Sequence, residues 1–239
     1  MSEPQVSKVA TTAAAIAIVS LSLPVLSVAG IHIGLLAPMA GFGLFAAGAV
    51  LGGLVSIILG VAGSVLTRGG ADPDGRTRSL TAIAGGVALL GVVALGGSPG
   101  AGLPSINDIT TDLADPPAFA ADPAERGRNM TYPADFVPQV EAAYPDLQPH
   151  AMSNTPADAF SRALAAADEL GWKVTLEDAD AGTFEARDAT TIFQFVDDVA
   201  VRIRSAGGGS VLDIRSKSRD GQGDLGANAA RIRAFLAKL

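Results

Sequence analysis

Long apolar stretches fill most of the first hundred residues, and short alternating patterns follow later in the chain. Three stretches, at about residues 9–31, 39–66 and 79–97, are apolar over enough length to cross a bilayer as helices, which takes about 20 residues. At 1.5 Å per residue the second would be about 42 Å long, so we expect it to tilt or overhang. The pattern predicts a transmembrane region of about three helices over residues 1–100.

The apolar pattern changes at Thr155. Thr155 and Pro156 are typical of a helix start, and Gly171 is typical of a helix end. Alternation then predicts four strands, near residues 172–177, 184–186, 199–204 and 212–219, and an apolar stripe predicts a final helix from about Asp224. We therefore expect residues 151–239 to form a small α+β domain, ordered helix, four-stranded antiparallel sheet, helix. Both helices would cover one sheet face and leave the other to water or a partner.

The segment between these regions is rich in proline. Residues 98–150 contain nine of the fourteen prolines, with two basic and eight acidic residues. This composition predicts extended or irregular chain. Apolar residues such as Ile106, Phe119 and Tyr144 favour a segment 101–150 that wraps the surface of the soluble domain, and a disordered linker is the alternative.

Charge is distributed very unequally along the chain. Residues 1–100 hold four basic and three acidic residues, whereas the other thirteen basic and twenty-one acidic residues follow Gly100. Arg68, Arg76 and Arg78 cluster between the second and third apolar stretches. Cytoplasmic loops carry the excess of Lys and Arg, so this loop and the N-terminus are expected in the cytoplasm. The prediction is a multi-pass protein of the inner (cytoplasmic) membrane, with its C-terminal domain on the exoplasmic side, which is periplasmic in a cell with two membranes.

Two alternatives concern the first stretch. Ser27-Val28-Ala29 resembles a signal-peptide cleavage site, although cleavage there would leave the C-terminal domain on the same side. A helical hairpin buried in a large soluble protein is the other alternative, but too little chain remains to cover it.

Small residues recur at every fourth position of the second stretch. They are Gly48, Gly52, Ser56, Gly60 and Ser64. Such a ladder lets two helices approach closely, either within the chain, which we favour, or in a homo-oligomer or with a partner protein. The stretches contain no Asp, Glu, Lys or Arg, which argues against a transporter, because such residues usually mark a transport route.

The candidate ligand-binding residues are cations that alternate outward on the last two strands. They are Arg202, Arg204, Arg215, Lys217 and Arg219. Together they would bind a phosphate, a lipid headgroup or the carboxylates of a partner. The alternative is that they pair with Asp213, Asp197, Asp198 or Glu185, and surface pairs of that kind contribute little.

Other chemistry has little support in the sequence. Residues 221–226 read G-x-G-x-x-G, but no acidic residue follows at the distance that a dinucleotide site needs. The chain has no Cys, and His150 is the single His beyond Gly100. No catalytic residues, metal site or cofactor are therefore predicted, and the acidic net charge argues against nucleic acid as a partner.

Four stretches resemble the family known as domain of unknown function 1499. They are Ile106–Asp112 followed by Pro116-Pro117, Tyr144–Leu147, Phe193–Arg204, and Ile214–Arg219 running into Asp224–Ile232. The resemblance covers about residues 105–238. It implies that the domain begins near Ile106 and that the protein is associated with a membrane or envelope, and it carries no established activity. The motif-matching residues, with an expected structural role, include Asp108, Asp112, Asp224, Asn228 and Arg231, besides Arg215 and Arg219.

The leading hypothesis is a membrane-anchored exoplasmic domain that binds a protein partner or an anionic envelope ligand and is not an enzyme. One alternative is an enzyme of unrecognised type that uses Asp and Arg residues near Asp108, Asp112 and Asp224. Another is a structural subunit of a membrane complex that assembles through its second span.

Overall fold

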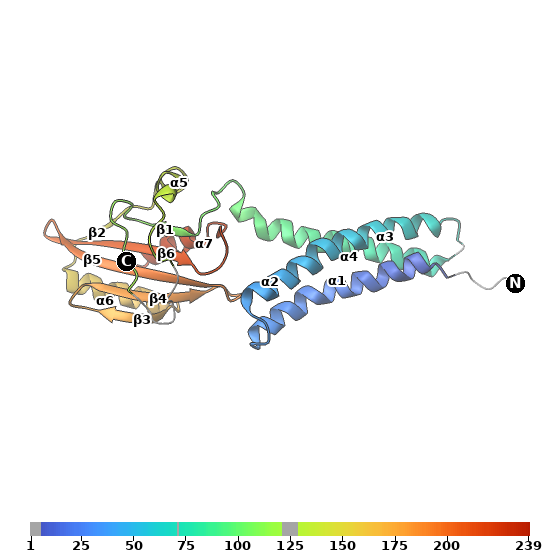
Figure 1. Ribbon diagram of the computed structural model, residues 1–239, viewed down its shortest axis with the longest axis horizontal. Coiled ribbons are helices and arrows are strands. Elements are labelled where there is room, and N and C mark those ends of the chain that lie inside the picture. The colour runs from blue at the N-terminus through green and yellow to red at the C-terminus, as the bar shows by residue number, and fades with distance from the viewer. Residues whose placement is uncertain (1–5, 71, 121–128) are drawn as a thin grey trace. The chain divides into compact units, whose positions relative to one another are not determined.

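The computed structural model describes residues 6–70, 72–120 and 129–239. Contacts divide the chain into two compact units (Figure 1). The first, here called the helical unit, comprises Met1–Pro99 and Thr191–Gln194. The second, the sheet domain, comprises Gly100–Thr190 and Phe195–Leu239.

Three long helices make up the helical unit. They are α1 (Lys8–His32), the run of α2 (Pro38–Ala46), η1 (Ala47–Gly52) and α3 (Gly53–Leu66), and α4 (Pro73–Gly97). Each is long and apolar enough to cross a membrane, so the three predicted spans are confirmed as helices. The second span is π-helical over η1. The third begins at Pro73, earlier than the apolar pattern indicated, because Asp72 caps it by accepting a hydrogen bond from the Gly75 N–H at 2.8 Å.

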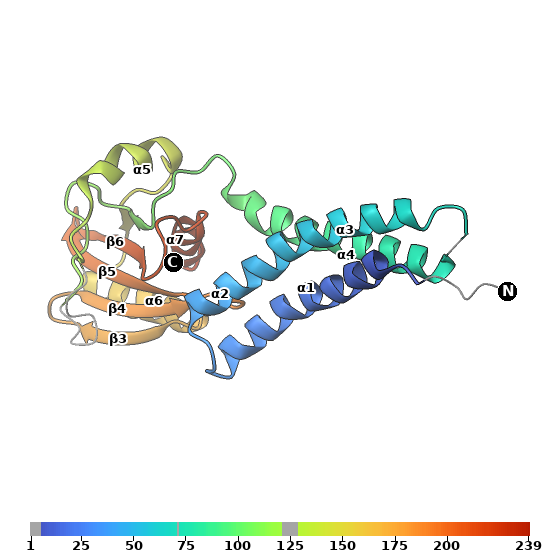
Figure 2. The same ribbon diagram turned by 45° about the vertical axis from the view of Figure 1, so that its right-hand side comes forward.

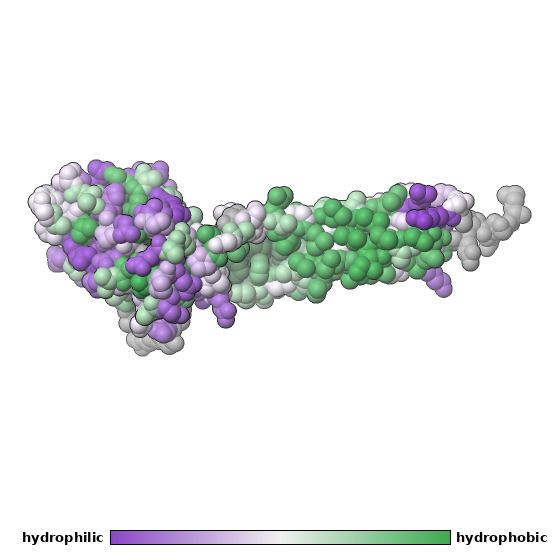
Figure 3. Space-filling view, turned by 90° about the horizontal axis from the view of Figure 1, so that it is seen from above, coloured by the Kyte–Doolittle hydropathy of each residue, from purple (hydrophilic) through white to green (hydrophobic). Residues whose placement is uncertain are grey.

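Small side chains occupy the interior of the helical unit, and large apolar side chains face outward. Ala10, Ala13 and Ala82 are fully buried, as is Ser56, whereas many Leu, Ile and Val residues of the same helices are exposed. The space-filling view shows these residues as a nearly continuous hydrophobic surface over the helices (Figure 3). The arrangement is the reverse of a water-soluble core.

The sheet domain is built on one antiparallel sheet of six strands, in the order β1-β6-β5-β4-β3, with β2 also paired to β6. The strands are β1 (Asp108–Thr110), β2 (His150–Met152), β3 (Lys173–Asp178), β4 (Thr183–Ala189), β5 (Val196–Ala206) and β6 (Gly209–Ser218). Gly207 and Gly208, both at positive φ, form the two-residue turn between β5 and β6, as a tight hairpin requires.

Two helices cover one face of this sheet, α6 (Pro156–Glu169) and α7 (Ala227–Leu236) (Figure 2). The core lies between them and the sheet, where Phe184, Ile214, Ile232 and Phe235 are fully buried. Thr155 caps α6 by accepting a hydrogen bond from the Asp158 N–H at 3.2 Å, and Gly171 ends it at positive φ. A short helix, α5 (Val137–Ala143), lies between β1 and β2, and η2 (Ser98–Gly100) and η4 (Ala134–Phe136) are single turns.

The structure corrects the expected soluble domain in three ways. It has six strands and not four, because the proline-rich segment contributes β1 and β2. These strands have three residues each, too few to show alternation. The alternation in β3 is typical of a strand with one buried face, but all six of its residues are exposed, because it lies at the end of the sheet. The final helix begins at Ala227 and not near Asp224, which leaves Leu225 exposed.

Candidate functional site

The outer face of the sheet, opposite α6 and α7, carries charged side chains from β5 and β6. Side chains alternate along a strand, so Val201 and Ile214 face the helices, while Arg202 and Asp213, directly opposite each other, face outward. This face was expected to be left to water or a partner. Instead, residues 111–120, here called the strap, run across it after β1.

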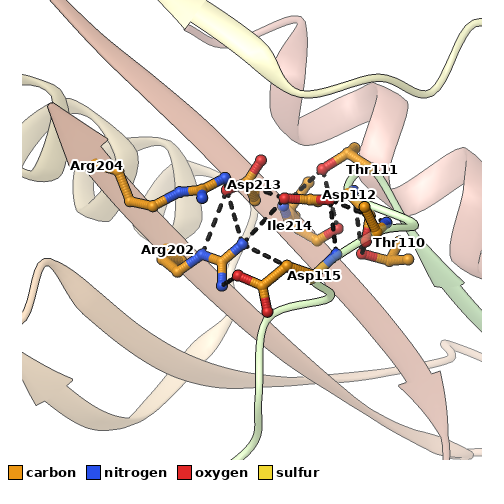
Figure 4. A network of polar contacts seen from close by, with 9 residues as sticks. Thr110, Thr111, Asp112, Asp115, Arg202, Arg204, Asp213 and Ile214 are labelled. Carbon is orange, nitrogen blue, oxygen red and sulfur yellow. Dashed lines mark hydrogen bonds and ion pairs between the residues drawn. The ribbon is translucent and has the colours of Figure 1, made fainter. Parts of the chain in front are cut away.

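Arg202 lies at the centre of the first cluster on this face (Figure 4). Its Nε and Nη2 donate to Asp213 Oδ2 at 3.3 and 3.1 Å. Its Nη1 donates to Asp115 Oδ2 at 2.9 Å, and its Nη2 to Asp112 Oδ2 at 3.2 Å. Arg204 Nη2 donates to Asp213 Oδ2 at 2.6 Å and to Asp112 Oδ2 at 3.0 Å. Two arginines of β5 therefore share one sheet carboxylate and bind two carboxylates of the strap.

Asp213 is the most enclosed member of this cluster. It is 0 % exposed, and its Oδ1 is buried without a hydrogen-bond partner among the described residues. Its Oδ2 forms a hydrogen bond that, as the largest cause, raises the pKa of Arg204. A buried carboxylate needs partners to offset its lost hydration, and here both arginines supply them through one oxygen.

Arg215 forms the second cluster and is 2 % exposed. Its Nε and Nη2 donate to the two oxygens of Asp108 at 2.9 and 2.7 Å, a bidentate pair of the strong kind. Lys217 Nζ donates to the same carboxylate at 2.9 Å. The Arg215 guanidinium also lies 4.9 Å from the ring centroid of Phe119 and 5.3 Å from that of Tyr132. Burial raises the pKa of Tyr132.

The third cluster on the outer face joins Arg219 and Arg187 to Asp198. Arg219 donates to both Asp198 oxygens at 3.0 and 2.7 Å, and Arg187 Nε lies 3.5 Å from Asp198 Oδ1. The five predicted cations therefore do share the outer face, but each is bonded to a carboxylate. Asp213 and Asp198 are among the partners that the alternative interpretation named. That interpretation did not include the carboxylates of β1 and the strap, Asp108, Asp112 and Asp115.

A separate polar cluster lies on the helix side of the sheet. Arg231 of α7 donates from Nε to Asp188 Oδ2 at 2.7 Å, and its Nη2 lies 2.6 Å from Asp197 Oδ2. Asn228 accepts from Ser216 Oγ at 2.6 Å and donates to Ser218 Oγ at 2.9 Å. Neighbouring Asp197 and Asp198 thus point to opposite faces, and Arg231 and Asn228 join α7 to the strands.

Asp224 and Asp197 are two acidic residues that lie near α7. Asp224 accepts from the backbone N–H groups of Gly226 and Asn228, both at 2.8 Å, and so caps α7. Burial raises the pKa of Asp197 despite the nearby Arg231. Of the motif-matching residues, Asp224, Asn228 and Arg231 lie around α7, while Asp108 and Asp112 lie on the outer face.

The small-residue ladder contacts other helices of the same chain. A Cβ on Gly48 would lie 2.8 Å from Pro24 Cδ, and Gly52 lies against Ser20 of α1. A Cβ on Gly60 would lie 2.7 Å from the Ser79 carbonyl oxygen of α4. Ser56 and Ser64 donate to carbonyl oxygens four residues earlier. Gly48, Gly52 and Gly60 therefore lie close to other helices of the same chain.

Potential metal ligands do not gather into a site in the residues that the structure describes. Among them, no group of three His, Cys, Asp or Glu side chains could hold a metal ion. Asp108, which the enzyme alternative named, forms a buried ion pair with Arg215.

Comparison with known proteins gives one result that identifies the chain. No curated protein matches it. The profile of one family, described as "Protein of unknown function (DUF1499)", matches residues 108–239. This stretch begins at β1, includes the strap and ends at the last residue, so it contains all the clusters described above. The chain therefore belongs to the DUF1499 family, with three apolar helices before the family domain.

Proposed function

We propose that the three long helices cross a membrane and anchor the sheet domain to it. Their surface supports this, because large apolar side chains face outward while Ala, Ser and Gly pack inside. Lipid offers no hydrophobic force that draws helices together, so membrane helices associate through small residues that allow close packing. The hydrophobic surface in Figure 3 is what a bilayer would cover.

The sheet domain is proposed to lie on the exoplasmic side. Ser7 N–H donates to Asp72 Oδ2 at 2.8 Å, so the start of α1 and the loop before α4 lie at the same end of the helical unit. Arg68, Arg76 and Arg78 belong to this end, and positive residues favour the cytoplasm. Since α4 runs from this end to the other, the chain enters the sheet domain on the opposite side.

Single cysteines test this orientation, because the chain contains no natural Cys. Thr77→Cys and Ala206→Cys are expressed separately and treated with a membrane-impermeant maleimide in intact cells, or in spheroplasts where an outer membrane is present. Labelling is expected at position 206 only, and at position 77 after lysis. Labelling at position 77 in the intact preparation would overturn the orientation.

The sheet domain is proposed to act by binding a protein partner at the edge of β3, and this rests on the exposure of that edge. Val174 and Leu176 are large apolar residues that remain exposed there. An open edge strand can accept an extended segment of another protein. Lys173 at one end of β3 and Glu177 and Asp178 at the other favour a partner segment with complementary charges.

The β3 strand also has a feature that opposes indiscriminate pairing. Its register with β4 shifts between Val174 and Leu176, and bulges and charged residues commonly protect an edge from aggregation. A partner must therefore match the bulge as well as the charges, which favours one specific segment.

Photocrosslinking in the native membrane tests the edge. A photoreactive amino acid at Val174 is compared with the same residue at Ala165, which is exposed on α6. A discrete crosslinked product is expected from position 174 only, and Lys173→Glu should abolish it. The same product from both positions, or none from position 174, would contradict partner binding at β3.

A further inference from the structure

The strap is attached to the outer face mainly by side chains. The backbone pairing of β1 with β6 ends at the first strap residue, where the Thr111 N–H donates to the Ile214 carbonyl at 3.0 Å. Beyond it, Arg202 donates to the Asp115 side chain and to its carbonyl oxygen, and Arg215 donates to the Pro117 carbonyl at 3.2 Å. The Ala120 N–H donates to Glu185 Oε1. Contacts of this kind can be exchanged for contacts to a ligand without unpairing a strand.

The charges on the outer face balance only when the strap is included. Six cationic side chains point outward from β4, β5, β6 and the residue after β6: Arg187, Arg202, Arg204, Arg215, Lys217 and Arg219. Four carboxylates of the same strands and β1 face them: Asp108, Glu185, Asp198 and Asp213. Asp112 and Asp115 of the strap add the remaining two negative charges. Without them this face would carry an excess of two positive charges.

Arg204 has unused hydrogen-bonding capacity. Its side chain is 43 % exposed, and its contacts with described residues all run through Nη2. The Nε and Nη1 donors are available for a second acceptor. Beside its neighbour Arg202, a hollow of about 190 Å³ lies between the strap and the strands, lined also by Pro117, Ala120 and Glu185. The site therefore offers donors and adjacent space.

We propose that Arg202 and Arg204 form a binding site for a phosphate group and that Asp112 and Asp115 occupy it when no ligand is bound. A phosphomonoester carries about 1.5 to 2 negative charges near pH 7, so it can replace the two strap carboxylates with little change in charge. Arginine forks bind phosphate oxygens in bidentate fashion. The phosphate takes the Arg204 Nη2 donor that Asp112 now holds, together with the adjoining donor of the same guanidinium, and the Arg202 Nη1 donor that Asp115 now holds. The strap then leaves the face.

This site does not depend on partner binding at β3 or on the side of the membrane that the domain occupies. Asp115 is the carboxylate that leaves first, because its side chain is 71 % exposed and, among the described residues, accepts from Arg202 alone. Asp213 stays in place, since it is buried and holds both arginines. A phosphate source can be a free phosphomonoester or a lipid headgroup.

Equilibrium dialysis with labelled inorganic phosphate tests the site, using the full chain in maltoside detergent at low salt. The Asp115→Asn variant is expected to bind phosphate roughly tenfold more tightly than the wild type, because a charged competitor is gone. Arg204→Met is expected to weaken binding roughly tenfold, since it removes the fork. Both side chains are exposed enough that the domain should keep its fold, which circular dichroism verifies.

Asp146→Asn is the matched control. Asp146 accepts from Arg233 in a bidentate pair at 2.6 and 2.8 Å, and Arg233 is 45 % exposed, close to the value for Arg204. This variant removes one carboxylate charge beside an exposed arginine that does not contact the strap. Phosphate affinity should stay at the wild-type value. An equal gain in Asp146→Asn and Asp115→Asn, or no gain in Asp115→Asn, would overturn the proposal.

Hydrogen exchange then tests whether phosphate displaces the strap, and whether the phosphate group comes from a free ion or from a lipid headgroup. Added phosphate should accelerate exchange of the strap amides in the wild type but leave β5 protected. If a lipid headgroup is the source, the strap amides should exchange faster in nanodiscs that contain phosphatidic acid than in nanodiscs of phosphatidylcholine, without added phosphate. Faster strap exchange in either arm supports the proposal and names the source. Unchanged strap exchange in both arms refutes it.

Discussion

In the helical unit the side chains that pack together are Ala, Ser and Gly, whereas in the sheet domain they are Phe, Ile, Leu and Val with paired Arg and Asp. Burial of apolar surface drives folding in water, so the sheet domain encloses its large apolar residues. Helices surrounded by lipid gain nothing by hiding such residues and gain contact area by close approach. This difference is what the proposed membrane anchor requires, with the helical unit in lipid and the sheet domain in water.

The sheet domain buries charges in ion pairs, whereas the buried Asp72 of the helical unit is held by backbone N–H groups. Asp108, Asp213 and Arg215 are almost inaccessible, and a charge is tolerated there only with partners. The ion clusters on both faces of the sheet meet this need. In the helical unit, close packing at glycines, such as Gly53 against Gly86, holds the helices together in place of ion pairs.

The largest expected effect comes from breaking a buried pair in the sheet domain. Asp108→Ala leaves Arg215 buried without its carboxylate and should lower the free energy of unfolding by about 3–5 kcal/mol. Denaturant unfolding in detergent measures this. The double variant Asp108→Leu with Arg215→Met removes both charges and should be clearly less destabilised. An equal loss in the two variants would show that lost packing, and not the unpaired charge, is the cause.

The next effect concerns close helix packing. A Cβ on Gly86 would lie 2.5 Å from the Gly53 carbonyl oxygen, so Gly86→Leu should force α3 and α4 apart and cost about 1–3 kcal/mol. Gly91→Leu is the control on the same helix, because nothing lies within 4 Å of its Cβ position. Thermal unfolding in detergent compares them. Similar midpoints for the two variants would argue against close α3–α4 packing.

A smaller effect is expected at the start of α7. Asp224→Ala removes a cap that binds two backbone N–H groups and should cost about 1 kcal/mol. Asp220→Ala, nearby and exposed, should leave stability unchanged. Hydrogen exchange at the first turn of α7 should rise in the first variant alone. If Asp220→Ala has the same effect, the loss reflects general charge and not capping.

The smallest effect is a pH dependence at the surface. The hydrogen bond from Arg233, as the largest cause, lowers the pKa of Asp146 below its usual 3.8. The pair therefore stabilises the fold fully above pH 3.8 and loses its effect as the pH falls through the lower, folded-state value. The effect should be small because the pair is exposed. Asp146→Asn should reduce the acid-induced loss of stability, and Arg233→Gln should do the same. An unchanged acid profile in both variants would rule out a contribution from the pair.

Much of each unit could be predicted from local pattern. The three apolar spans, the cap at Thr155 and the helix end at Gly171 were correct, because they depend on neighbours in sequence. The alternation of β5 and β6 also placed Arg202, Arg204 and Lys217 correctly on the outward face. The sequence therefore indicated the helices, most strands and the orientation of their side chains.

The pattern of apolar and polar residues did not predict strands β1 and β2, nor the ion pairs with Asp108, Asp112 and Asp115. Strands β1 and β2 have no periodicity, and they form because β6 offers its edge to them. The five predicted cations were correctly placed outward, but their accessibility depends on the strap. The signal that could have found this was the group of acidic residues at Asp108, Asp112 and Asp115, which matches the charge of the basic strands.

The amino-acid sequence by itself determined which segments are apolar enough to lie in lipid and which residues share a strand face, because both follow from composition and backbone geometry. Only the tertiary structure decided which charges meet. Arg215 and Asp108 are 107 positions apart, and Arg202 and Asp115 are 87 apart. No local rule links such residues. Their contact depends on the proline-rich segment that lies across the sheet and brings Asp108 and Asp115 beside the arginines of β5 and β6.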